Sequence, residues 1–115
     1  MYAINLGVDV FYADRKLVAV CASMAKMTRA FGTVRARRVA MRLQQLRVAE
    51  TLAELRLVTG RCHELTEDRK GCLALDLDGP YRLVFEPEEW VVDVRGNLDW
   101  SAVRAVVVLE IVNYH

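Results

Sequence analysis

The spacing of apolar residues changes once along this chain, and that change limits the possible folds. Between residues 17 and 46 the apolar positions recur every three or four residues, which is typical of helices that bury one face. Between residues 72 and 86 the period is two, which is typical of strands. Residues 4–12 predict a further strand, and the β-branched segment 103–114 predicts a central one. The order predicts an α+β domain, with two helices packed on one face of a small, mostly antiparallel sheet.

Capping and turn residues set the limits of these segments. Asp14 is placed to cap the first helix, and Gly32 is placed to end it. A capping box over residues 51–54 predicts another short helix. Residues 78–80 and 95–97 predict turns between strands.

Length and composition indicate a single domain over residues 1–115. Hydrophobic residues make up 54% of the chain and charged residues 27%, so the chain can bury a core and is not disordered. No apolar run approaches the roughly 20 residues of a membrane-spanning helix, and we expect no membrane association. Three cysteines without a CxxC pair, and no secretory signal in residues 1–12, favour a cytoplasmic location.

The formal net charge of +1 conceals an uneven distribution. Residues 15–49 hold nine basic side chains and no acidic one, whereas residues 71–115 hold three basic and eight acidic side chains. This asymmetry favours a polyanion or an acidic partner on one side of the molecule. Arg35, Arg38 and Arg42 follow at helical spacing, so they form either a surface for phosphate groups or a solvated helix face.

A few side chains could take part in acid–base or anion chemistry. His63 and His115 are the only histidines, and each is either a general acid or base or a solvated surface residue. Arg82 lies within a strand, where it needs either a ligand anion or a carboxylate such as Asp76 across the hairpin.

The remaining polar segments contain no motif for a metal or an activated nucleophile. Cys62, His63 and Cys72 could converge across a hairpin, but buried cysteine as a small apolar residue is the simpler interpretation. We therefore expect no metal and no cofactor. The charged turn over residues 68–71 is either a solvated hairpin tip or part of a substrate surface.

Taken in order, these pieces resemble one known family. The matching segments are Arg61-Cys62-His63-Glu64-Leu65, Asp68-Arg69-Lys70-Gly71, Asp76 and Gly79-Pro80-Tyr81-Arg82-Leu83-Val84-Phe85-Glu86-Pro87. This combination is similar to the core of the HigB branch of the RelE/ParE toxin superfamily. The ending Asn113-Tyr114-His115 resembles the terminal Asp-Tyr-His of that branch, and the resemblance runs from about residue 8 to the end.

The resemblance implies both a fold and an activity. It implies a RelE-like fold, in which two helices cover one face of a small antiparallel sheet. It also implies the toxin of a type II toxin–antitoxin system, a metal-independent endoribonuclease that cuts messenger RNA on the ribosome. A HigA-like helix-turn-helix antitoxin would neutralise it.

The same resemblance assigns roles to individual residues. His63 and His115 become the acid and base, Arg82 the phosphate clamp, and Tyr114 a group that stacks on a base or places the phosphate. The expected substrate-binding residues are Arg69, Lys70 and Asn113, and the expected ribosome- or antitoxin-docking residues are Arg35, Arg38 and Arg42.

Two other classes of function stay open at this point. A ParE-like toxin inhibits DNA gyrase without cutting RNA and would not need the terminal Tyr-His. A degenerate toxin fold would only bind its antitoxin, and Asn113 in place of the family's aspartate motivates this alternative.

Overall fold

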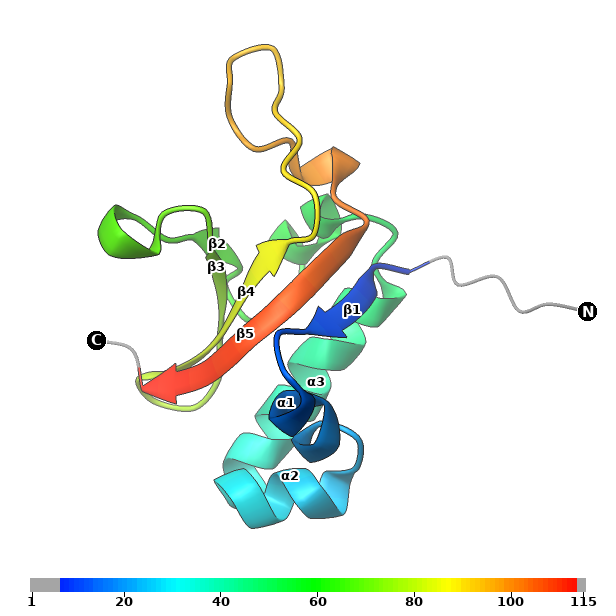
Figure 1. Ribbon diagram of the computed structural model, residues 1–115, viewed down its shortest axis with the longest axis vertical. Helices are drawn as coiled ribbons and strands as arrows, with labels where there is room; N and C mark the ends of the chain where they lie inside the picture. The colour runs from blue at the N-terminus through cyan, green and yellow to red at the C-terminus, as the bar shows by residue number, and fades with distance from the viewer. Residues whose placement is uncertain (1–6, 114–115) are drawn as a thin grey trace, which may run out of the picture.

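The structure is a computed structural model that describes residues 7–113 of the chain. Its regular elements are shown in Figure 1. They are β1 (Asp9–Tyr12), α1 (Arg15–Val20), α2 (Met24–Phe31), α3 (Thr33–Val48), β2 (His63–Glu64), β3 (Leu73–Asp76), β4 (Tyr81–Pro87) and β5 (Ala105–Asn113). Short 3-10 helices cover Leu52–Arg56, Glu67–Arg69 and Trp100–Ala102. The α+β class predicted from the sequence is confirmed.

The strands form one five-stranded mixed sheet in the order β1-β5-β4-β3-β2. The pairs β2/β3, β3/β4 and β4/β5 are antiparallel, whereas β1 runs parallel to β5, with Asp9 opposite Ala105. The prediction of a mostly antiparallel, RelE-like sheet is therefore corrected to a mixed sheet. A parallel pair needs a long crossover connection, which the segment between β1 and β5 supplies. Alternation of apolar residues is the same in both pairings and could not distinguish them.

The helical layer has three helices where the sequence predicted two. Asp14 caps α1, as predicted, because its Oδ1 accepts a hydrogen bond from the Leu17 amide at 2.8 Å. The chain then breaks, and the side chain of Ser23 caps α2 by accepting from the Lys26 amide at 3.1 Å. Gly32 ends α2 as predicted, with a φ of +83° that favours glycine.

The helices cover one face of the sheet and leave the other face largely bare (Figure 1). The main core joins buried residues of α3, such as Val39 and Leu43, to Leu75 and Leu83 of the sheet. We call the opposite side the open face. Its apolar cluster is small, with Leu65, Ala74 and Val84 as its buried members. Polar side chains therefore have room on the open face.

Within residues 7–113, no helix is both long and apolar enough to cross a membrane.

Candidate functional site

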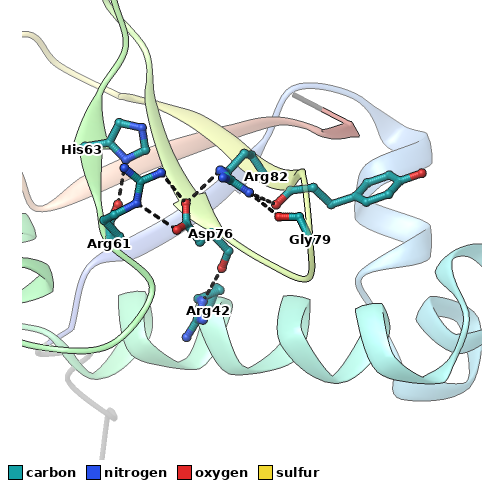
Figure 2. A network of polar contacts seen from close by, with 7 residues as sticks. Arg42, Arg61, His63, Asp76, Gly79 and Arg82 are labelled. Atoms are coloured by element: carbon teal, nitrogen blue, oxygen red, sulfur yellow. Dashed lines mark hydrogen bonds and ion pairs between the residues drawn. The ribbon is translucent and has the colours of Figure 1, made fainter. Parts of the chain in front are cut away.

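Strand register brings polar side chains together on the open face. His63 of β2 lies opposite Ala74 of β3, which lies opposite Val84 of β4. Asp76 lies opposite Arg82 in the same ladder. Directly opposed residues share a face, and so do residues two positions apart, so all of these side chains lie on the open face. Figure 2 shows His63, Asp76 and Arg82 in this cluster.

Arg82 is paired with the carboxylate across the hairpin. Its Nε lies 2.8 Å from Asp76 Oδ1, and its side chain is only 17% exposed. Its Nη1 donates to the carbonyl oxygens of Gly79, at 2.9 Å, and Tyr81, at 2.8 Å. The structure thus shows the ion pair that the sequence left as one of two alternatives.

Arg61 joins the same carboxylate and was missed by sequence reasoning. Its Nε donates to Asp76 Oδ2 at 2.9 Å and its Nη2 to Oδ1 at 3.3 Å. The hydrogen bond and charge of Asp76 raise the pKa of Arg61. Its side chain is 65% exposed. Two guanidinium groups therefore share one carboxylate, which leaves the cluster net positive and favours an anionic ligand.

The backbone at Arg61 is unusual for a residue with a side chain. Its φ is +46°, and the preceding Gly60 has a φ of +112°. Such conformations cost free energy in residues other than glycine and often occur at functional sites. The glycine before a basic residue and a strand was the one sequence signal that could have drawn attention to this position.

His63 is oriented by the main chain of Arg61. Its Nδ1 lies 2.7 Å from the Arg61 carbonyl oxygen (Figure 2). Because a carbonyl can only accept, we assign the proton to Nδ1, so that Nε2 of the neutral ring has a lone pair. The ring is half-buried. Its Nε2 is therefore suited to take a proton from a ligand.

The charged turn between β2 and β3 reaches across the open face. Arg69 forms an ion pair with Glu110 of β5, which lies opposite Val84 in the ladder. The hydrogen bond that Arg69 donates to the Glu110 carboxylate is the main cause of the raised pKa of Arg69. Lys70 is exposed. Of the two predicted substrate-binding residues in this turn, Arg69 is thus already paired and Lys70 faces solvent.

The end of β5 leads toward the same site. Asn113 is the last residue of β5, is exposed, and lies opposite Tyr81, the neighbour of Arg82. Tyr114 and His115 fall outside the described residues. Their approach to His63 therefore stays a prediction.

The three arginines predicted to form a docking stripe lie in different environments. Arg38 is exposed. Arg35 is half-buried, pairs with Asp78 at 3.0 Å and stacks 3.3 Å from the centre of the Tyr81 ring. Arg42 is only 3% exposed, so its prediction as a surface docking residue is wrong. The reason lies in the helical spacing, since position 42 falls three residues after Val39 and thus on the apolar face of α3.

The cysteines of this region are protonated thiols near neutral pH. Burial raises the pKa of Cys62 to about 12, and burial also raises that of Cys72. Within residues 7–113, no three His, Cys, Asp or Glu side chains are grouped closely enough to hold a metal ion.

No family model matches this chain, and comparisons with curated proteins and with solved structures give no match either. The resemblance to HigB toxins therefore stays a prediction.

Proposed function

We propose that this protein is a HigB-type toxin of a type II toxin–antitoxin system. It is a metal-independent endoribonuclease that cuts messenger RNA on the ribosome in the cytoplasm. The observation that carries the proposal is the position of His63 next to two arginines that share the Asp76 carboxylate.

The chemistry of metal-free RNA cleavage matches these groups. The 2′-OH attacks the adjacent phosphorus, the P–O5′ bond breaks, and the products carry a 2′,3′-cyclic phosphate and a 5′-OH. The step needs a base at the 2′-OH, cations beside the phosphoryl oxygens and an acid at the leaving oxygen. In our proposal His63 Nε2 takes the proton, and His115 gives one to the leaving oxygen.

The phosphate would bind where the Asp76 carboxylate now engages two guanidinium groups. A phosphodiester carries the same single negative charge and also accepts parallel hydrogen bonds from arginine. Arg82 would clamp the phosphate with its guanidinium group, and the exposed Arg61 would swing from Asp76 onto it. Tyr114, Lys70 and Asn113 would contact the neighbouring nucleotides.

The basic helical layer would face the larger partners. Arg38 is exposed on α3 and would contact ribosomal RNA or an acidic segment of a HigA-like antitoxin. Arg35 would contribute less, because Asp78 already neutralises it.

The test compares variants in growth and in cleavage. His63→Ala and Arg82→Ala should each lower ribosome-dependent cleavage by about 10²–10⁴-fold. Arg95→Ala, on an exposed turn far along the chain from the site, is the matched control and should cleave like wild type. New 5′ ends inside translated messages are the readout.

Three outcomes would contradict this proposal. Undiminished cleavage by His63→Ala would remove the base from the mechanism. Intact messages together with inhibited DNA gyrase would instead support a ParE-like toxin, and a harmless chain that still binds an antitoxin would support the degenerate module.

A further inference from the structure

A buried arginine lies directly beneath the candidate site. Arg42 projects from α3, and its Nε donates to the main-chain carbonyl oxygen of Asp76 at 2.7 Å (Figure 2). Its Nη1 lies 3.3 Å from both Gln45 Oε1 and Thr59 Oγ1. A buried charge destabilises the fold unless its hydrogen-bond donors are satisfied, and Arg42 is only 3% exposed.

Arg42 has neutral acceptors rather than a carboxylate in direct contact. Burial is the main cause that lowers the pKa of Arg42, and the charge of Arg38 lowers it further. The charge of Asp76 acts in the opposite direction. The cluster thus holds three guanidinium groups, those of Arg42, Arg61 and Arg82, around one carboxylate. An anionic ligand would reduce this excess of positive charge.

The main chain of Asp76 is held from two directions. Its amide donates to the Gly60 carbonyl oxygen at 2.7 Å, while its own carbonyl accepts from Arg42. Gly60 also lies against Arg42, since a Cβ at residue 60 would lie 2.9 Å from Arg42 Nε. Arg42 and Gly60 therefore fix the residue whose carboxylate holds both Arg61 and Arg82.

We propose that Arg42 is a positioning residue that acts through Asp76 to hold Arg61 and Arg82 in an anion-binding arrangement. The proposed ligand class, a phosphodiester, rests on the proposed function. The positioning itself can be tested with inorganic phosphate. Arg42 touches no substrate in this arrangement, so its effect should appear in anion affinity and in the environment of His63.

The experiment measures phosphate binding to the full chain by the NMR signals of labelled histidine. Arg42→Met fills similar volume but removes the charge and the donors, and it should weaken phosphate binding about tenfold. It should also shift the His63 Nδ1 signal, because the Arg61 carbonyl would move with the loop. Arg37→Met, at an exposed position on the same helix, is the control and should bind phosphate within about twofold of wild type.

Two further variants keep the test decisive if Arg42→Met folds poorly. Arg42→Lys retains the charge and one donor nitrogen, so it should recover part of the affinity. Gly60→Ala should displace the Arg42 guanidinium and reproduce the loss, and its effect should be smaller in an Arg42→Met background.

Each result separates this inference from the proposed function. Folded Arg42→Met that binds phosphate like wild type would overturn the inference, as would wild-type protein without saturable phosphate binding. If phosphate binding follows the predicted order but wild type leaves ribosome-bound messages intact, the inference stands and only the nuclease proposal fails.

Discussion

Two neighbouring residues of β4 face opposite sides of the sheet, and their surroundings differ. Leu83 and Val84 are both fully buried, but Leu83 faces the main core and Val84 faces a cluster with two other buried members. Around Leu83 the helices supply apolar area, whereas around Val84 the next positions hold charged side chains. The main core on one face thus supplies most of the buried apolar area, whereas the other face carries the candidate site.

The largest expected effect tests this division directly. Leu83→Ala should lower the free energy of unfolding by about 3 kcal/mol, because it leaves a cavity in the main core. Val84→Ala, on the open face, should cost about 1–2 kcal/mol, because it removes less apolar area from a smaller cluster. Urea unfolding measures both. Equal costs would contradict the division between the faces.

An intermediate effect should appear as a dependence on pH. The pKa of Cys62 is about 12 in the folded protein against an ordinary 9.0, so the folded state disfavours the thiolate. The stabilising contribution is complete below pH 9.0 and is lost as pH rises toward 12. Stability should therefore fall by about 1.4 kcal/mol per pH unit in this window. Urea unfolding of wild type and Cys62→Ala, from about pH 8 to pH 10, gives the difference. If the free energy of unfolding changed equally with pH in the two proteins, this prediction would be wrong.

The smallest expected effect on stability concerns an ion pair on the open face. Arg69→Gln removes the ion pair with Glu110, but the Arg69 side chain is 32% exposed. Such a pair contributes no more than about 1 kcal/mol, so the free energy of unfolding should hardly change. The same unfolding assay at low and high salt measures it. A loss above about 2 kcal/mol would show that the open face also carries stability.

Local signals in the sequence predicted the fold better than long-range ones did. Asp14 and Gly32 begin and end helices as expected, because capping depends on a few adjacent backbone groups. The turn at Gly79 and the antiparallel pairing of β3 with β4 follow from local alternation. The parallel position of β1 could not be read, since it depends on how distant segments pack.

In the candidate site, too, local contacts were predicted from the sequence and long-range contacts were not. The pairing of Arg82 with Asp76 was one of two expected outcomes, because the turn at residues 78–80 places these two residues opposite each other on adjacent strands. Arg61 was missed because its role depends on a backbone conformation that no side-chain pattern encodes. The prediction of Arg42 as a docking residue was wrong because a charge usually indicates a surface position, whereas its helical spacing places Arg42 on the apolar face of α3.

The parallel pairing of β1 with β5 also has a consequence for synthesis of the protein. Asp9 pairs with Ala105, so β1 can take its place in the sheet only after β5 has been made. A nascent chain that has not reached residue 105 lacks β5, the strand that lies between β1 and β4, and it also lacks Asn113, the last residue of β5. The sheet that holds the candidate site is therefore complete only after residues 105–113 have left the ribosome.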